Sequence, residues 1–316
     1  MRVASLFCGI GGLDKGFLNA GFDIIWANDF DKYAVQTYNA NYDCPATLAD
    51  ITEFPIENIP EFDVLLGGFP CQPFSMMGSQ KGFEDTRGTL FFRIAEIVNY
   101  QITVRQHKPR AIILENVRAL RTHDNGHTFA RIKQILREDL GYQVFDMNLN
   151  SSDYGVPQTR NRTYIICFAN PAIRQFDPPP TVPLTYYLKD ILETDVPDKY
   201  FLTEKIKSTI LSNGTGGWEA KAETDLPVAR PLCATMAKMH RASQDNYVTQ
   251  KKGLRRLTPR ECSRLQGFDG PQSSEFIIPV SDSQAYKQFG NAVTVNVARA
   301  VAVEVRKKLE ETGEWF

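Results

Sequence analysis

Short apolar runs alternate with stretches of helical periodicity through the first half of the chain. The apolar runs predict buried strands at 3–7, 22–27, 64–66, 111–114, 144–149 and 164–168. The stretches between them predict helices at 12–20, 31–40, 89–104 and 126–140. Strands that alternate with helices form a mostly parallel sheet covered on both faces. The sequence therefore predicts a doubly wound α/β domain.

A proline-rich segment at 171–183 interrupts this alternation, because the three consecutive prolines 178–180 cannot continue a central strand or a helix. The residues that follow show no sustained period and are rich in Gly, Asn, Ser and Thr, which is typical of a small, loop-rich domain. Helical periodicity returns at 295–309 and predicts an amphipathic helix that packs back on the first domain. We expect a discontinuous first domain at 1–180 and 282–316, and a second, smaller domain at 181–281.

Composition excludes several classes of protein. The 316 residues contain no apolar run of about 18 residues and no positively charged leader before an apolar stretch, so we expect neither membrane insertion nor secretion. The six cysteines lack the close pairing of a metal site and the density of a disulfide scaffold. We therefore expect a cytoplasmic protein without a metal site.

Charge is distributed unevenly along a chain whose net charge is −1. Residues 1–62 carry three basic and nine acidic side chains, whereas 238–264 carry eight basic and two acidic ones. A basic segment on an otherwise acidic protein is the electrostatic footprint expected of binding to a phosphate backbone. A solvated charged face accounts for the charge pattern equally well.

A lone cysteine, Cys71, lies where a predicted buried strand leads into the loop Gly-Gly-Phe-Pro-Cys-Gln-Pro-Phe-Ser at 67–75. Pro70 and Pro73 fix the backbone on either side of the thiol, and the two glycines let another molecule approach closely. An isolated cysteine is most often a small buried hydrophobic residue. This nine-residue context instead favours a nucleophile.

The first predicted strand leads into Phe7-Cys8-Gly9-Ile10-Gly11-Gly12 and then a helix, a pattern that brings a cofactor to a helix N-terminus. Asp14 replaces the third glycine of the dinucleotide fingerprint. A carboxylate at a helix start would repel a pyrophosphate, so a cofactor without phosphate fits better. Asp29-Phe30 can bind ribose hydroxyls and an adenine ring, and Asp50-Ile51, after a third strand, can hold the amine and face of that adenine. A helix cap or a solvated loop end explains each acid equally well.

Two further motifs carry ionisable groups to the same predicted sheet. The strand at 111–114 ends in Glu115-Asn116-Val117, at the edge where open α/β sheets bind ligands. Partial burial would raise the pKa of Glu115 and keep a proton available for a ring nitrogen. In Gln158-Thr159-Arg160-Asn161-Arg162, strand alternation sends both guanidinium groups to one side, where they need an anionic or carbonyl partner. A structural ion pair is the alternative for either arginine.

Together these motifs resemble the cytosine-C5 DNA methyltransferases of the bacterial restriction-modification type over nearly the whole chain. Arg-Leu-Thr-Pro-Arg-Glu at 256–261 and Gln-Phe-Gly-Asn-Ala-Val at 288–293 resemble the two closing motifs of that family. The resemblance implies an S-adenosylmethionine-dependent methyltransferase fold, with a target-recognition region near 181–255. The implied cofactor-binding residues are Phe7, Gly9, Gly11, Gly12, Asp29, Phe30, Asp50, Ile51, Pro70, Asn291 and Val293.

The resemblance also implies a covalent mechanism. Cys71 would add to C6 of a cytosine flipped out of duplex DNA, because C5 is too poor a nucleophile to attack the methyl group directly. Glu115 would hydrogen-bond N3 and the exocyclic amine, and Arg162 would bind the O2 carbonyl. Arg160 would lie near the thiolate and a phosphate, and the cationic pair would lower the pKa of the thiol. No residue identifies itself as the base that removes the C5 proton, so we assign that step to ordered water.

Candidate DNA contacts follow from composition and from the family. The segment 76–89 has the composition of a mobile lid, which in the family closes over the DNA. Met77 or a residue of 237–246 is the candidate for filling the gap left by the flipped base. Arginine favours guanine and amide side chains favour adenine in the major groove. The DNA-binding candidates are Ser75, Met77, Lys81, Arg87, Arg241, Gln244, Asn246 and Arg256.

Three other functions remain open at this point. A transfer-RNA cytosine methyltransferase shares the catalytic apparatus, but the Cys-Phe-Thr signature of that branch is absent. A nucleic-acid-binding regulator with an inactive catalytic domain conflicts with the intact Cys71, Glu115 and Arg162. A nicotinamide dehydrogenase conflicts with Asp14 in the glycine turn. We expect a monomer that acts on double-stranded DNA, with any cognate restriction endonuclease encoded separately.

Overall fold

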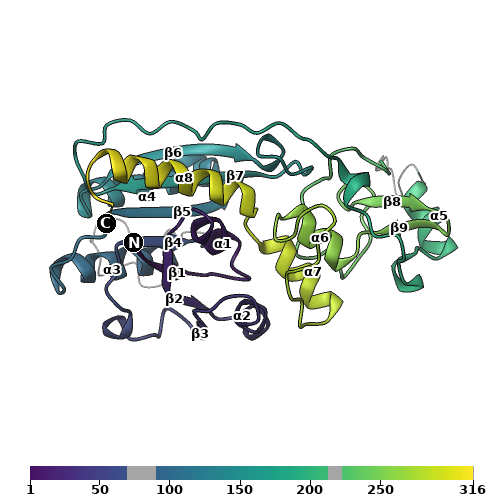
Figure 1. Cartoon of the computed structure of the whole chain (residues 1–316), viewed down its shortest axis with the longest axis horizontal. Helices are drawn as coiled ribbons and strands as arrows, with labels where there is room; N and C mark the ends of the chain where they lie inside the picture. Colours follow the sequence, from purple (N-terminus) through teal and green to yellow (C-terminus); the bar gives the residue numbers. More distant parts are fainter. Residues whose placement is uncertain (70–89, 213–222, 316) are drawn as a thin grey trace.

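The computed structural model describes residues 1–69, 90–212 and 223–315 (Figure 1). A seven-stranded sheet has the order β3-β2-β1-β4-β5-β7-β6. All neighbouring strands pair in parallel except β7, which runs antiparallel to both β5 and β6. The predicted doubly wound, mostly parallel sheet is therefore confirmed. The strands are β1 (Arg2–Leu6), β2 (Asp23–Asp29), β3 (Ala46–Leu48), β4 (Val64–Gly67), β5 (Ala111–Val117), β6 (Gln143–Asn150) and β7 (Asn161–Phe168).

Helices cover both faces of this sheet and create two hydrophobic cores. Because side chains alternate along a strand, neighbouring residues of β4 enter different cores: Val64 packs with residues of α1 and α8, and Leu65 with residues of α3 and α4. The covering helices are α1 (Gly12–Leu18), α2 (Lys32–Asn39), α3 (Leu90–Thr103), α4 (His127–Gln134) and α8 (Val295–Glu311). A π-helical turn, Ile135–Asp139, extends α4.

The second lobe is rich in loops and carries a small hairpin, drawn on the far side of α6 and α7 from the large sheet in Figure 1. Its elements are α5 (Glu204–Leu211), β8 (Tyr247–Gln250), β9 (Gly253–Arg256), α6 (Pro259–Leu265) and α7 (Asp282–Asn291). Short 3-10 helices lie at Ile56–Asn58, Arg118–Arg121, His123–Gly126, Ser151–Asp153, Leu188–Ile191 and Asp198–Tyr200. A third core joins α6 and α7 to Ile10 and Ala34 of the first lobe. The domain boundaries at 181 and 282 stay a prediction.

The C-terminal helix α8 packs directly against α1, as its periodicity indicates. Gly16 makes this approach possible, because a Cβ at that position would lie 2.4 Å from the Cβ of Ala298 and 2.6 Å from the backbone nitrogen of Arg299. The chain thus returns to its N-terminal half after the second lobe. In the part of the chain that the structure describes, no helix combines the length and the apolar character needed to cross a membrane.

We expect Gly16→Ala to lower the free energy of unfolding. Alanine gains about 0.5–1 kcal/mol over glycine inside a helix, but the added methyl forces α8 away from α1, and such overpacking costs about 1–3 kcal/mol. The net effect is a loss, measurable by urea denaturation. Gly270→Ala is the matched control, since its Cβ would meet Ser273 at an ordinary 3.5 Å. Equal stability of the two variants would contradict the close packing of α1 and α8.

Candidate active site

The parallel strands place the ends of β1, β2, β4 and β5 at one edge of the sheet, where a cavity of about 460 Å³ opens. The residues that follow these strands line it, together with 287–293 from α7 and the connection to α8. Ligands of open α/β sheets bind at this edge. The cavity is therefore the site predicted from the glycine turn and from Glu115.

Three backbone positions in the loop after β1 have positive φ, at Phe7 (54°), Gly9 (57°) and Gly11 (79°). A Cβ on Gly11 would lie 2.4 Å from the ring of Tyr42, and one on Gly12 would lie 2.2 Å from the carbonyl oxygen of Val293. Both glycines are therefore required by packing within the protein. Gly9 has nothing within 4 Å of its Cβ position and is the glycine that leaves room for a ligand.

Asp29 ends β2 and holds the glycine loop. Its carboxylate accepts backbone N–H bonds from Gly9 (2.9 Å) and Asp31 (2.8 Å), and burial raises its pKa. The next residue, Phe30, exposes 71% of its surface and lines the cavity. An acceptor thus stands beside an open aromatic face, as the sequence predicts for a nucleoside.

Asp50 and Ile51 do not line the cavity, in contrast to the sequence prediction. Asp50 accepts hydrogen bonds from the amide and hydroxyl groups of Thr52, and the Ile51 side chain is buried in the core between the sheet and α3. Arg93 on α3 donates to the carbonyl of Ile51 at 2.8 Å and fixes this turn. The turn closes the end of β3 and supports the site from outside the cavity wall.

Asp14 is fully buried in the first turn of α1. Its carboxylate accepts hydrogen bonds from the hydroxyls of Ser5 (2.6 Å) and Tyr38 (2.7 Å), which come from β1 and α2. Burial raises the pKa of Asp14 to about 6. The carboxylate is therefore a buried part of the cavity wall, at the helix start where the sequence places it.

Glu115 and Arg162 form an ion pair in the cavity, with the Nε of Arg162 3.1 Å from Oε1 of Glu115. The pair results from the reversal of β7, whose first residues lie beside the last residues of β5, with Val117 opposite Arg162. Burial raises the pKa of Glu115, as predicted, and the two nearby arginines partly offset the shift.

Arg160 also lines the cavity, but its side chain is fully buried and anchored to the backbone. Its guanidinium donates to the carbonyls of Leu232, Gly290 and Ala292, each at 2.9 Å. Burial lowers the pKa of Arg160 to about 9, with a further contribution from Arg162. These contacts differ from the predicted position near a phosphate, because they use Arg160 to join the second lobe to the cavity.

The segment that contains the predicted nucleophile begins and ends at the cavity wall. Phe69 and Leu90, the residues that flank 70–89, both line the cavity, and Asn116 donates to the carbonyl of Phe69 at 2.8 Å. Asn291 and Val293 line it as well, as predicted. Six predicted site residues lie outside the described residues: Pro70, Cys71, Ser75, Met77, Lys81 and Arg87.

The basic segment 238–264 is less available to DNA than its charge indicates. Arg255 is fully buried and makes two hydrogen bonds, 2.8 and 2.7 Å long, to the carboxylate of Glu261. Arg260 pairs with Asp269, and Arg264 donates to backbone carbonyls. Among the basic side chains of this segment, all of them described, Lys238 and Lys251 are exposed and make no hydrogen bond or ion pair with a described residue.

The residues predicted to contact DNA bases differ in side-chain exposure and in their partners within the protein. Asn246 is buried, and its amide group binds the backbone N–H and carbonyl of Arg230, so the structure contradicts its assignment to DNA. Arg241 pairs with Asp245 at 3.0 Å, and Arg256 contacts His240. The side chain of Gln244 is exposed. Sequence alone missed these partners because they depend on how the loops fold.

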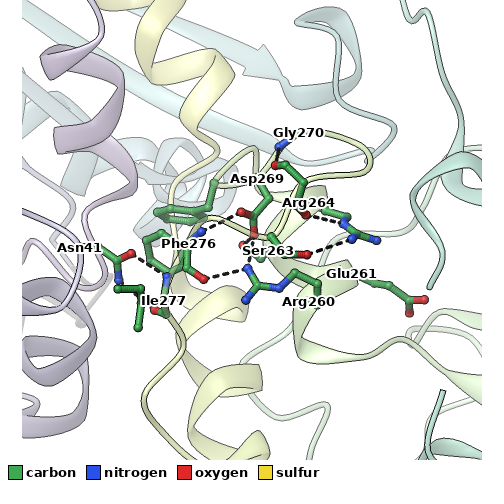
Figure 2. A network of polar contacts seen from close by, with 12 residues as sticks. Asn41, Arg260, Glu261, Ser263, Arg264, Asp269, Gly270, Phe276 and Ile277 are labelled. Carbon is green, nitrogen blue, oxygen red and sulfur yellow. Dashed lines mark hydrogen bonds and ion pairs between the residues drawn. The ribbon is translucent and has the colours of Figure 1, made fainter. Parts of the chain in front are cut away.

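A polar network fixes α6 against the first lobe. Figure 2 shows Asp269 at its centre, accepting hydrogen bonds from Arg260, Ser263 and the backbone N–H of Phe276. The next residue, Ile277, exchanges two backbone hydrogen bonds with the side chain of Asn41, just beyond α2. Because α2 begins at the cavity, the network sets the position of the second lobe relative to the site.

Two charged residues of the described cavity wall were not predicted from the sequence. Lys287 on α7 forms an ion pair with Asp31 at 2.6 Å, and both line the cavity beside Phe30. Asp31 follows the Asp29-Phe30 motif, and Lys287 precedes the motif at 288–293. These adjacent motifs are the sequence signal that could have identified the two residues. Within the ranges that the structure describes, no three His, Cys, Asp or Glu side chains gather in a way that could hold a metal ion.

Comparison with known proteins gives consistent results. The family model described as C-5 cytosine-specific DNA methylase matches residues 1–307. Type II methyltransferase M.SsoII of Shigella sonnei is 40% identical over 322 residues, covering 98% of this chain and 81% of the relative. Type II methyltransferase M.HhaI of Haemophilus parahaemolyticus is 36% identical over 326 residues, covering 98% and 95%.

Solved structures share the fold at low sequence identity. The Entamoeba histolytica methyltransferase EhMeth superposes with a TM-score of 0.76 at 20% identity, covering 98% of both chains. The S. pombe Dnmt2 methyltransferase superposes with a TM-score of 0.74, also at 20% identity, covering 99% of both chains. These two similarities concern the fold alone.

We expect Glu261→Gln to destabilise the protein by about 3–5 kcal/mol, because it leaves Arg255 buried without a compensating charge. The control is Glu310→Gln, which removes the same kind of partner from Arg306 on the surface and should cost less than about 1 kcal/mol. Urea denaturation measures both variants. A loss of similar size in the two would show that burial does not set the strength of the Arg255 pair.

Proposed function

This chain belongs to the C-5 cytosine-specific DNA methylase family, and from that premise we propose a covalent mechanism of methyl transfer to DNA. The enzyme is a DNA cytosine-C5 methyltransferase of the type found in restriction-modification systems. We propose that it uses S-adenosylmethionine and forms an adduct between Cys71 and C6 of a flipped-out cytosine. The observation that carries the proposal is the Glu115–Arg162 pair, which shares one cavity with the glycine loop and with both flanks of 70–89.

The electrostatics of the cavity fit S-adenosylmethionine, which supplies an electrophilic methyl group on a positively charged sulfur. The two carboxylates beside the glycine loop, Asp14 and Asp29, have no cationic partner among the described residues. Such a wall favours a cation and opposes the pyrophosphate of a dinucleotide. A nicotinamide dehydrogenase is thereby disfavoured. Asp29 would bind the ribose hydroxyls and Phe30 would stack on adenine, whereas Asp50 and Ile51 would support the site from outside the cavity.

The Glu115–Arg162 pair fits the polar edge of cytosine. An acid that donates to N3 and a guanidinium that donates to the O2 carbonyl would withdraw electrons from the ring and make C6 electrophilic toward the Cys71 thiolate. The pairing of the two side chains orients both before the base arrives, so little reorganisation is required. Arg160 would act as a positioning residue, since its described contacts hold the backbone around the cavity.

Burial supports the proposed role of Glu115 as an acid. Its raised pKa makes the protonated form more accessible near neutral pH than that of an exposed glutamate. A protonated Glu115 would supply the hydrogen to N3 as Cys71 adds to C6. The C5 proton would leave after methyl transfer, with ordered water as base, and elimination would free Cys71.

The target base would have to leave the duplex, because attack on C6 comes from above the ring face. We assign target recognition to the second lobe near 181–255, with Gln244, Arg241 and the exposed Lys238 as candidate DNA contacts. Asn246 is withdrawn from that set. Labelled S-adenosylmethionine with DNA or RNA as acceptor distinguishes this function from a transfer-RNA methyltransferase and from an inactive regulator. A separately encoded endonuclease would complete the restriction-modification system.

We expect Cys71→Ser to abolish methyl transfer while duplex DNA binding survives, because only the thiolate adds readily to C6. A duplex with 5-fluorocytosine at the target should become covalently trapped on the wild-type enzyme in the presence of the methyl donor, since fluorine at C5 blocks elimination. Denaturing gel electrophoresis detects the adduct. The same duplex with Cys71→Ser is the control, and a wild-type enzyme that methylates cytosine yet gives no adduct would refute the covalent route.

We expect Glu115→Gln to lower kcat by at least about a hundredfold, because the amide cannot deliver a proton to N3. In the wild-type enzyme kcat should fall as pH rises through the raised pKa of Glu115, where the protonated form is lost. This alkaline limb should be absent in the variant. Single-turnover kinetics across pH measure both effects. An unchanged alkaline limb in Glu115→Gln would assign that titration to another group.

A further inference from the structure

One buried carboxylate of the cavity wall, that of Asp14, has no role in the chemistry described above. Its partners from other residues are two hydroxyl groups, on Ser5 and Tyr38, and no described cation forms an ion pair with it. Hydrogen bonds from hydroxyls favour the charged form of the carboxylate, and burial removes the water that would screen that charge. The charge therefore acts on whatever occupies the cavity.

The other acidic groups of the cavity are compensated. Glu115 pairs with Arg162, and Asp31 pairs with Lys287. Asp29 accepts two backbone N–H groups, from Gly9 and Asp31. Among the described cavity carboxylates, Asp14 is thus the one that has no ion pair and accepts no hydrogen bond from the backbone N–H of another residue.

We propose that Asp14 makes the cavity discriminate between the positively charged methyl donor and its neutral product. This inference rests on the proposed use of S-adenosylmethionine. Donor and product share adenosine and the amino-acid group, and they differ in the sulfur, which is a sulfonium cation before transfer and a neutral thioether afterwards. An uncompensated negative charge stabilises the first and not the second. Transfer of the methyl group then weakens binding and favours release of the product.

The charge of Asp14 is expected to change near neutral pH. Burial raises the pKa of Asp14 to about 6, so the group is mostly ionised above that value. The titratable groups that interact electrostatically with it are Cys8 in the loop, Tyr38 and Tyr42 on and beyond α2, and Cys44 before β3. Burial raises the pKa of all four, so they stay neutral. Asp29 at the end of β2 is another cavity acid whose pKa is raised, and it needs a control.

Calorimetric titration of the full chain with S-adenosylmethionine and with S-adenosylhomocysteine tests the proposal without any turnover. Asp14→Asn is isosteric and removes the charge. We expect it to weaken binding of the donor about tenfold, equivalent to about 1.4 kcal/mol, and to change binding of the product less than about twofold. Sinefungin, which carries a charged amine in place of the sulfonium, should behave like the donor.

Two control variants separate charge from structure. Tyr38→Phe removes a hydrogen bond that lowers the pKa of Asp14 but keeps the carboxylate, so at a pH well above that pKa it should affect both ligands equally. Asp29→Asn removes the proposed ribose acceptor, which both ligands use, and should also weaken both equally. Equal weakening of donor and product by Asp14→Asn would overturn the proposal and leave Asp14 a structural role.

The pH dependence of the wild-type protein provides a second measurement that needs no variant to fold. The ratio of donor to product affinity should fall as pH decreases through about 6, where Asp14 becomes neutral. The ratio should be independent of pH in Asp14→Asn if Asp29 makes no contribution. A constant ratio in the wild-type protein contradicts the proposal. Absence of any binding of either ligand would instead contradict the proposed cofactor.

Discussion

The reversal of a single strand determines the chemistry of this site. If β7 ran parallel to β5, its first residues would lie at the opposite edge of the sheet from Glu115. Because it runs antiparallel, Arg162 stands beside the end of β5 and pairs with Glu115, while Arg160 donates to the carbonyls of Leu232 and Gly290. The sheet therefore supplies an acid, a cation and a structural anchor at the edge where the parallel strands present the glycine loop.

Local sequence patterns predicted most of the sheet, because the apolar pattern of a strand or helix lies within a few neighbouring residues. The strand and helix ranges follow from apolar runs and helical spacing, and the positions of Asp29 and Glu115 follow from the rule that ligands bind at strand ends. The position of Val293 follows from the family resemblance alone. The direction of β7 is not a local signal. The spacing of the two arginines predicted that both lie on one side, and both line the cavity, but the spacing did not show that Arg160 binds backbone carbonyls.

The charge pattern alone did not show which basic side chains are available to DNA, because tertiary contacts decide this. A run of basic residues looks the same in sequence whether it faces a phosphate backbone or buried carboxylates, and here Arg255 and Arg260 face Glu261 and Asp269. The same holds for Asn246, whose amide closes a loop. Asp14 shows the converse case. Its position suggested a charge that repels a pyrophosphate, and only the fold shows that the hydroxyls of Ser5 and Tyr38 bind it inside the protein.

The cavity is divided electrostatically along its length, and this division suits a reaction in which charge moves. Beside the glycine loop, Asp14 and Asp29 have no cationic partner among the described residues, whereas at the end of β5 every described charge is paired or bound to carbonyls. A cationic donor is attracted to the first region, and a neutral base with carbonyl and ring-nitrogen acceptors fits the second. Transfer of the methyl group removes the positive charge from the acidic region. The wall that binds the cationic donor would therefore bind the neutral product more weakly.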